Sequence, residues 1–94
     1  MATFINQLES IIQDRKQNPE SGSYTTSLFE GGLDRILRKV GEESGELIIA
    51  AKNQDATEVS EECADLLYHV LVLLAQQGMS FSDVEAVLKA RHAD

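Results

Sequence analysis

The fold of this chain is decided by two long stretches, LDRILRKVGEESGELIIAAKN at residues 33–53 and ATEVSEECADLLYHVLVLLAQQ at residues 56–77. Both stretches repeat apolar residues at the three- and four-residue spacing of an amphipathic helix. Because only a short connection separates them, the two helices are expected to lie antiparallel and side by side. The sequence therefore predicts an all-α helical bundle built around two long central helices.

Shorter helices are expected on both sides of this pair. The same periodicity predicts them over residues 4–17, 24–30 and 81–91. Pro19 and its neighbours break the first of them. Gly78 suits the left-handed position after the second long helix, and Ser80 suits the N-cap of the last helix. No segment alternates at the period of a strand, so residues 1–94 are expected to form a single all-α domain.

The charge of the chain disfavours two classes of partner. Sixteen Asp and Glu residues against eight Lys and Arg residues give a net charge of −8. Binding to nucleic acid or to an anionic membrane surface needs a basic surface instead. The longest apolar run covers only residues 70–75, far short of the roughly 20 residues of a membrane span. We therefore expect neither nucleic acid nor membrane as a partner.

Cysteine content and the N-terminal sequence bear on the cellular location. Cys63 is the one cysteine of the chain, which excludes an internal disulfide framework and fits a reducing compartment. We expect this side chain to serve packing. The first residues contain no basic stretch leading into an apolar one, so no signal peptide is expected. These features favour a cytoplasmic location.

Acidic residues occur on helix faces that otherwise look like core. When each long helix is phased at about 100° per residue, four carboxylates fall within or beside the apolar stripes: Glu43, Glu46, Glu62 and Asp65. Residues three apart on a helix are surface neighbours, so each pair can present two carboxylates to one point. The 15 residues between Glu46 and Glu62 are enough to finish one helix, turn and bring the second pair alongside the first.

Such a group of carboxylates requires compensation. Two like charges ~4 Å apart repel by about 4 kcal/mol even at an effective dielectric near 20. Either some of them are protonated or a cation lies among them. Oxygen ligands of this kind suit Mg²⁺, Mn²⁺ or Ca²⁺ rather than zinc, and Mg²⁺ is usually shared with substrate phosphates. The simpler interpretation, an acidic helix that exposes its charges to water, fits one Glu-x-x-Glu pair better than two on adjacent apolar stripes.

Candidate substrate-binding residues accompany the carboxylates. They are Lys39, Lys52, Tyr24, Arg35, Arg38 and His69. A triphosphate needs several cations, and arginine offers bidentate contacts to phosphate oxygens. Each of these cations could instead be solvated or ion-paired. His69 follows Asp65 by one turn on the inward face and could be a hydrogen-bonded core residue, a support for a carboxylate or a substrate contact.

Several segments together resemble one known family. They are Ser23-Tyr24-Thr25, Lys39-Val40-Gly41-Glu42-Glu43-x-x-Glu46, Ala50-Ala51-Lys52 and Glu61-Glu62-x-x-Asp65-Leu66-Leu67-Tyr68-His69. Over about residues 18–92 the chain resembles the phosphoribosyl-ATP pyrophosphohydrolase family of histidine biosynthesis. The Glu-x-x-Glu and Glu-x-x-Asp frame alone indicates only the wider MazG-like superfamily of all-α nucleotide pyrophosphohydrolases.

The resemblance implies an activity and a set of site residues. The activity is Mg²⁺-dependent hydrolysis of phosphoribosyl-ATP to phosphoribosyl-AMP and pyrophosphate by a stand-alone homodimer or larger bundle. The family's metal-binding carboxylates correspond to Glu43, Glu46, Glu62 and Asp65, and its phosphate-handling cations to Lys39 and Lys52. Our hypothesis is that Mg²⁺ activates a water whose proton passes to Glu43 or Glu46 as the catalytic base.

The sequence leaves two alternative functions open and predicts one contact with a second copy. The chain could be a house-cleaning pyrophosphohydrolase of dUTP, dCTP or damaged nucleotides, although the lack of tryptophan disfavours that relative. It could also be a non-catalytic acidic dimerisation module whose inward carboxylates pair with Lys39 and Lys52. On the second long helix a further apolar face is expected to be covered by a second copy of the chain. That face consists of Leu67, Val70, Leu71 and Leu74.

Overall fold

The protein consists of five α-helices in the computed structural model, which describes residues 3–93. The helices are α1 (Phe4–Gln17), α2 (Tyr24–Gly31), α3 (Leu33–Lys52), α4 (Ala56–Gln76) and α5 (Phe81–His92). Within these described residues no strand is formed. The all-α prediction is confirmed, and every helix boundary lies within one residue of the boundary that the sequence predicts.

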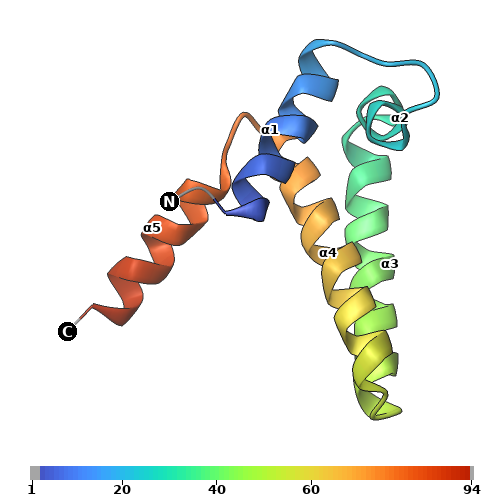
Figure 1. Cartoon of the computed structure of the whole chain (residues 1–94), viewed down its shortest axis with the longest axis vertical. Coiled ribbons are helices and arrows are strands. Elements are labelled where there is room, and N and C mark those ends of the chain that lie inside the picture. Colours follow the sequence, from blue (N-terminus) through green and yellow to red (C-terminus); the bar gives the residue numbers. More distant parts are fainter. Residues whose placement is uncertain (1–2, 94) are drawn as a thin grey trace.

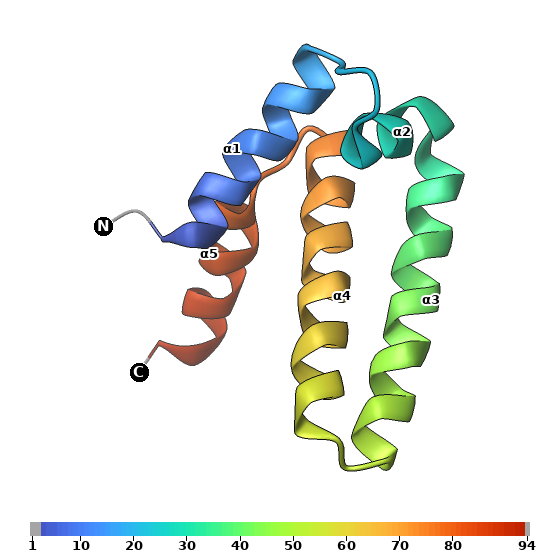
Figure 2. The same cartoon turned by 45° about the vertical axis from the view of Figure 1, so that its right-hand side comes forward.

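The two long helices α3 and α4 lie side by side as an antiparallel pair, and the upper end of α1 extends beyond the end of α4 (Figure 1, Figure 2). Residues 53–55 connect them, and the side chain of Asp55 accepts a hydrogen bond from the Glu58 amide at 3.1 Å as the N-cap of α4. This cap satisfies one of the amides that a helix start leaves free. The short connection fixes which residues of α3 face which residues of α4.

The short helix α2 lies across the open end of this pair (Figure 2). A single residue, Gly32, connects it to α3 with φ 87° and ψ 178°. This backbone region is essentially restricted to glycine, so the sharp junction depends on the missing side chain. At the other end of α2, Ser23 accepts a hydrogen bond from the amide of Thr26 at 3.1 Å and so sets the first turn.

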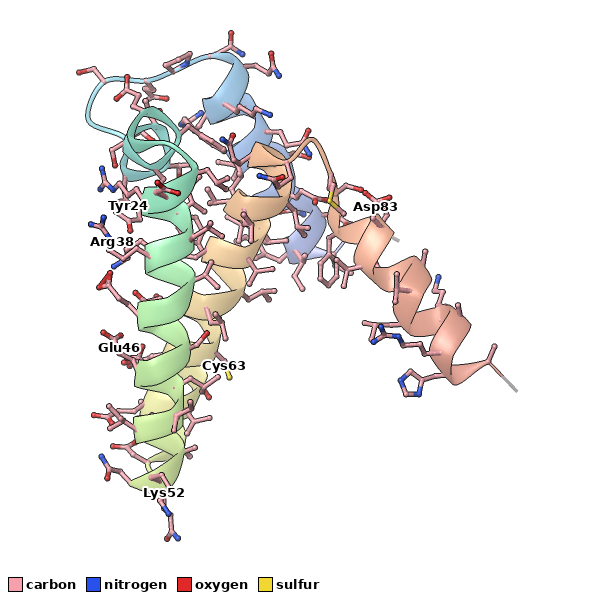
Figure 3. The ribbon with its side chains drawn as sticks, turned by 180° about the vertical axis from the view of Figure 1, so that it is seen from behind. Tyr24, Arg38, Glu46, Lys52, Cys63 and Asp83 are labelled. Carbon is pink, nitrogen blue, oxygen red and sulfur yellow. The ribbon has the colours of Figure 1, made fainter. Side chains whose placement is uncertain are left out.

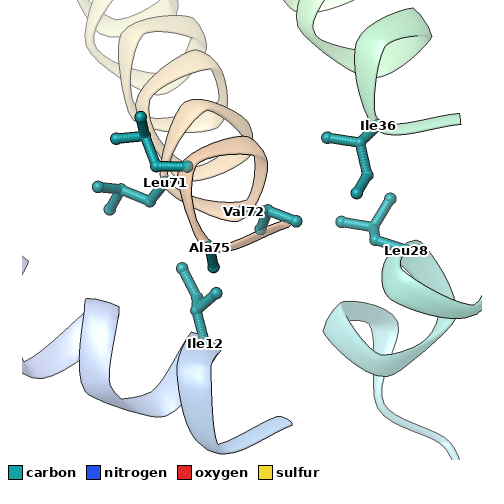
Figure 4. Packing of buried hydrophobic residues seen from close by; sticks show 7 residues of the cluster. Ile12, Leu28, Ile36, Leu71, Val72 and Ala75 are labelled. Carbon is teal, nitrogen blue, oxygen red and sulfur yellow. The ribbon is translucent and has the colours of Figure 1, made fainter. Parts of the chain in front are cut away.

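The hydrophobic core lies at the junction of α1, α2 and the upper halves of α3 and α4. Figure 4 shows its two parts on either side of α4, with Ile12 of α1 against Ala75, and Leu28 and Ile36 close to Val72. These buried side chains form one cluster, which also contains Leu71 and Leu74. The lower halves of α3 and α4 contribute no residue to it. The long helices therefore hold a polar site below an apolar core.

One expectation about α4 is wrong in part. The sequence predicted that a second copy would cover the face formed by Leu67, Val70, Leu71 and Leu74. In the structure Leu71 and Leu74 are buried within the chain itself, in a cluster that includes Ile12 of α1. Leu67 and Val70 are half-buried against the same cluster. The reason is that α1 folds back onto α4, which phasing of the long helices alone cannot predict.

The C-terminal helix α5 leads away from the α3–α4 pair (Figure 1). Its start is fixed by Glu9 of α1, whose carboxylate accepts a hydrogen bond from the Phe81 amide at 2.6 Å. Asp83 accepts a second hydrogen bond, from the Ser80 amide at 2.9 Å. Negative charge at a helix N-terminus is favourable, so both carboxylates stabilise this end of α5. Most of the rest of α5 is exposed to solvent.

Two further expectations concern membranes and Cys63. Between residues 3 and 93, no helix combines the length and apolar character required to cross a lipid bilayer. Cys63 was expected to pack against apolar side chains, but it is exposed on α4. The expectation is wrong because no part of residues 3–93 covers that side of the lower half of α4.

Candidate metal centre

Three acidic side chains meet where α3 and α4 face each other below the core. Glu43 comes from α3, and Glu62 and Asp65 come from α4. One carboxylate oxygen from each lies within 4.8 Å of the others. Glu43 is only 6% exposed, Glu62 is half-buried and Asp65 is exposed, so the group opens from the helix interface toward solvent. The prediction that carboxylates of the two helices converge at one point is confirmed for these three.

Two oxygen atoms of this group are buried without a hydrogen-bond partner among the described residues. They are Oε2 of Glu43 and Oε2 of Glu62. Leaving a buried acceptor unsatisfied is costly, and more so when it is charged. A divalent cation would satisfy both atoms at once. An all-carboxylate donor set of this kind suits Mg²⁺ or Mn²⁺, so the residues fit the metal that the sequence implied.

Glu43 remains ionised because of a lysine on its own helix. The Lys39 ammonium lies 3.3 Å from Oε1 of Glu43, one turn away. Burial is the largest single influence on Glu43 and opposes its ionisation, but the hydrogen bonds from Lys39 and Glu46 and the charge of Lys39 together hold the pKa of Glu43 below its usual value. The same hydrogen bond raises the pKa of Lys39. The pair thus places one negative and one positive group at the inner wall of the site.

Glu62 has the opposite behaviour. A hydrogen bond shared with Glu46 is the main cause, and burial and the charges of Glu46, Asp65 and Glu43 add to it, so that the pKa of Glu62 rises to about 7. Glu46 therefore lies beside Glu62, although it is exposed and outside the group of three. Without a cation, the neighbouring negative charges and burial thus favour the protonated form of Glu62, with its pKa at about 7.

Tyr24 and His69 meet one turn above the carboxylates. His69 is 4% exposed, and its Nε2 lies 3.0 Å from the hydroxyl of Tyr24. Its Nδ1 lies 2.7 Å from the backbone carbonyl oxygen of Asp65. Tyr68 completes the arrangement: its ring stacks on Tyr24 with centroids 6.2 Å apart, and its hydroxyl bonds to Thr25. The sequence singled out Tyr24 and His69, but it gave no sign that they touch.

Tyr68 was missed as a contributor to the site, whereas Thr25, with Ser23 and Tyr24, was a candidate from sequence for donating to phosphate or ribose. Tyr68 stood inside a quoted motif, yet no charge or spacing set it apart from an ordinary core aromatic. Its ring stacks on Tyr24, and its hydroxyl hydrogen-bonds to Thr25. The only signal available from sequence was the position of Tyr68 three residues after Asp65, on a neighbouring part of the same face.

Three predicted substrate-binding residues are not gathered at the carboxylates. Arg35 donates a hydrogen bond to the backbone oxygen of Ser27 at 3.2 Å and so braces α2 against α3. Arg38 is exposed on α3. Lys52 is exposed and ends α3, six residues or about 9 Å of helix beyond Glu46. Figure 3 shows Tyr24, Glu46 and Lys52 following one another down the length of the molecule. Substrate roles for these three cations stay predictions.

Comparison with known proteins places the site in a family. The family described as phosphoribosyl-ATP pyrophosphohydrolase matches residues 5–92. The chain belongs to the phosphoribosyl-ATP pyrophosphohydrolase family. The match includes all of α2, α3 and α4, and with them every carboxylate of the candidate metal centre.

Similar relatives fall into two kinds within this family. The phosphoribosyl-ATP pyrophosphatase of Streptococcus thermophilus is 60% identical over 78 residues, which are 83% of this chain and 75% of the relative. That of Clostridium botulinum is 53% identical over 93% of this chain and 79% of the relative. The histidine biosynthesis bifunctional protein HisIE of Bacillus subtilis is 53% identical over 97% of this chain, but this covers only 44% of the relative. The chain therefore spans less than half of the bifunctional protein.

Proposed function

We propose that this protein hydrolyses phosphoribosyl-ATP to phosphoribosyl-AMP and pyrophosphate in a Mg²⁺-dependent reaction of histidine biosynthesis. Membership of the family and the names of similar relatives support this substrate. The observation that carries the chemistry is the convergence of Glu43, Glu62 and Asp65 with two unsatisfied buried oxygens. The Lys39–Glu43 ion pair is one feature that the non-catalytic alternative expects, but Lys52 is exposed at the end of α3 and makes no ion pair with the carboxylates among the described residues.

Mg²⁺ is the proposed cofactor, and Mn²⁺ could replace it. Glu43, Glu62 and Asp65 would hold the cation, and Glu46 would complete the predicted set of ligands from its place beside Glu62. When bound, the metal supplies neutralising charge for the triphosphate and makes water more acidic. Lys39 holds Glu43 ionised, which favours a cation over a proton at this carboxylate.

Proton transfer falls to a carboxylate that the cation does not fully occupy. The sequence left Glu43 and Glu46 as candidates, and we propose Glu46 because it is the exposed member outside the group of three. It accepts a proton from the attacking water as that oxygen bonds to a phosphorus of the α–β anhydride. The bond between this phosphorus and the bridging oxygen breaks, and pyrophosphate is released. No covalent protein intermediate is required.

The proposal is tested by assaying pyrophosphate release from phosphoribosyl-ATP and from a panel of nucleoside triphosphates. We expect phosphoribosyl-ATP with Mg²⁺ to be the preferred substrate. Glu46→Gln and Asp65→Asn should lose about 100-fold or more in rate, in the range typical of a lost acid–base or metal-binding group. Glu61→Gln is the matched control, because Glu61 is an exposed neighbour of Glu62 outside the site. Near-normal turnover by both site variants would contradict the proposal.

We also propose that the protein works as a homodimer or larger homo-oligomer in the cytoplasm. Large apolar side chains remain exposed along the outer side of α3, including Leu33, Leu37 and Ile48. At about 100° per residue these three share one stripe, which lies away from the stripe that carries Glu43. A second copy covering this stripe would bury it without closing the carboxylate site. The lone cysteine and the biosynthetic role support the cytoplasmic location.

A further inference from the structure

Both ring nitrogens of His69 have partners, and these partners fix where its proton lies. The backbone carbonyl oxygen of Asp65, 2.7 Å from Nδ1, can only accept a hydrogen bond. Nδ1 must therefore carry the proton. In a neutral imidazole the other nitrogen, Nε2, is then an acceptor.

The hydroxyl of Tyr24 lies 3.0 Å from that nitrogen, and with a neutral imidazole it donates its only proton to His69. What the phenolic oxygen can still offer is lone pairs. The ring cannot easily turn to change this, because it stacks on Tyr68 at 6.2 Å and meets the His69 ring edge-on at 5.9 Å. Tyr24 is nevertheless 46% exposed. It presents to solvent an oxygen that can accept a hydrogen bond but has no proton left to donate.

A hydrogen-bond acceptor at this position can bind only those groups of the substrate that donate a hydrogen bond. Oxygens of an ionised triphosphate carry no proton to give, so the Tyr24 oxygen would repel them rather than bind them. Hydroxyl groups of a sugar do carry one. Tyr24 also lines a cavity of about 670 Å³ together with residues of the 19–23 loop, Thr26, Ser27 and Glu30. None of Glu43, Glu62 and Asp65, which would hold the phosphates through the metal, lines that cavity.

We infer that Tyr24 accepts a hydrogen bond from a hydroxyl of the ribose that carries the triphosphate, and that His69 is a positioning residue that fixes Tyr24 as an acceptor. This inference rests on the proposed function and deepens it. The ribose in question is the one bonded directly to the α-phosphate, so it is the sugar nearest to the phosphates held at the metal centre. The sequence motif Ser23-Tyr24-Thr25 thereby serves sugar recognition rather than phosphate recognition.

The test compares ligands with and without these hydroxyls. Binding of ATP and of 2′,3′-dideoxy-ATP, each with Mg²⁺, is measured by calorimetry, and pyrophosphate release is measured from the phosphoribosyl derivatives of both nucleotides. The wild-type protein should prefer the hydroxylated ligand by about three- to tenfold, the value of one neutral hydrogen bond. Tyr24→Phe should abolish that preference. It should leave affinity for the dideoxy ligand unchanged, because no hydroxyl is lost there.

Variants of His69 separate positioning from a general effect on the fold. His69→Leu removes the acceptor for Tyr24 and should abolish the hydroxyl preference, whereas His69→Gln offers an amide oxygen and should restore part of it. Combining Tyr24→Phe with His69→Leu should reduce the preference no further than Tyr24→Phe alone. Glu61→Gln is the control: Glu61 is exposed on α4 outside the site, and the variant should keep the preference.

The outcomes distinguish this inference from the proposed function. If wild-type protein releases pyrophosphate but Tyr24→Phe keeps the full hydroxyl preference, the inference is wrong and the function stands. If no pyrophosphate is released, the function fails, and calorimetry still decides whether Tyr24 reads the ribose of ATP. Equal binding of ATP and 2′,3′-dideoxy-ATP by the wild type would overturn the inference. Should His69→Leu not fold, Tyr24→Phe, whose side chain is half exposed, carries the test alone.

Discussion

Single side chains decide the charge state of the metal centre. Glu43 is the more buried carboxylate, yet its pKa is lowered by the hydrogen bond from Lys39 against the effect of burial. Glu62 is less buried, yet its hydrogen bond with Glu46 and the surrounding negative charges raise its pKa to about 7. The partners thus outweigh burial at Glu43 and act in the same direction as burial at Glu62. Glu43 is therefore ionised before a cation binds, whereas Glu62 loses its proton more readily when a cation binds.

This arrangement predicts how stability without metal depends on pH. The folded pKa of Glu62, about 7, exceeds its ordinary value of 4.5. Its contribution to stability is therefore fully present below pH 4.5 and is lost as the pH rises through 7. We expect the melting temperature of metal-free protein to fall across this window. The melting temperature of Glu62→Gln should fall less, because the glutamine side chain has no proton to lose in this pH range.

Thermal unfolding in a chelating buffer at a series of pH values, followed by circular dichroism, measures how the melting temperature changes with pH for the wild type and for Glu62→Gln. Glu61→Gln provides the control, since Glu61 is exposed and should leave the slope of the wild type unchanged. Adding Mg²⁺ should raise the melting temperature of the wild type but not of Glu62→Gln, because the cation binds only the folded site. Identical slopes for the wild type and Glu62→Gln would show that Glu62 keeps an ordinary pKa.

For single residues, the sequence predicted which carboxylates meet, but not which other side chains contact one another. Helical phasing was sufficient for Glu43, Glu62 and Asp65, because the period of a helix fixes which side chains share a face. It could not assign the Tyr24–His69 contact, since those residues are 45 apart in sequence. It also could not separate Arg35, which braces α2 through Ser27, from a phosphate ligand. Such distinctions depend on tertiary distances rather than on residue type.

Among the helices, the junction between α2 and α3 does most to position the site. Gly32 connects them in one residue with φ 87° and ψ 178°, so that α2 crosses the pair and carries Tyr24 toward His69. A β-carbon at this position meets no neighbouring atom, so backbone strain alone would oppose a substitution. The direction of α2, and with it the position of Tyr24, therefore depends on one glycine.

Gly32→Ala should lower the free energy of unfolding by about 2 kcal/mol, within the range for a residue forced into this region of backbone space. Gly45→Ala is the matched control, since Gly45 lies inside α3 with open space around it. Alanine there should be neutral or stabilising by up to about 1 kcal/mol. Urea unfolding of the two variants measures the difference. A Gly32→Ala protein as stable as the wild type would mean that the junction can adopt another backbone conformation.

Helix boundaries were the best-predicted feature of the fold, because local signals set them. The side chains of Ser23 and Asp55 accept N-cap hydrogen bonds at the starts of α2 and α4. Gly78 takes φ 73° directly after α4, as the left-handed position requires. The packing of α1 on α4 was not predicted. That contact is made by apolar side chains such as Ile12, whose partner no local pattern identifies.

Considered as a whole molecule, the chain has a core at one end and an exposed apolar surface along α3. The buried cluster lies above the carboxylates, and exposed large apolar residues extend to Ile48 and Ile49 near the lower end of α3. Contiguous exposed apolar surface is typical of sites that contact another protein. A second copy is the occupant we propose, since it would cover this surface without using the carboxylate site.

Sedimentation analysis at micromolar concentration should therefore give a dimer or larger species. Ile48→Glu places a charge in the proposed contact and should shift the protein toward monomer while its helical content remains. Glu42→Gln, an exposed change on the same helix, should leave the assembly state unaltered. Wild-type protein that sediments purely as a monomer would contradict the proposed assembly.

The most direct test of the account is whether the three converging carboxylates bind a divalent cation. Mn²⁺ is titrated into the protein, and the signal of free Mn²⁺ is followed by electron paramagnetic resonance. The wild type and Glu61→Gln should remove Mn²⁺ from solution, and Asp65→Asn and Glu62→Gln should bind it at least tenfold more weakly. Equal uptake by all four proteins would show that Glu62 and Asp65 do not hold the metal.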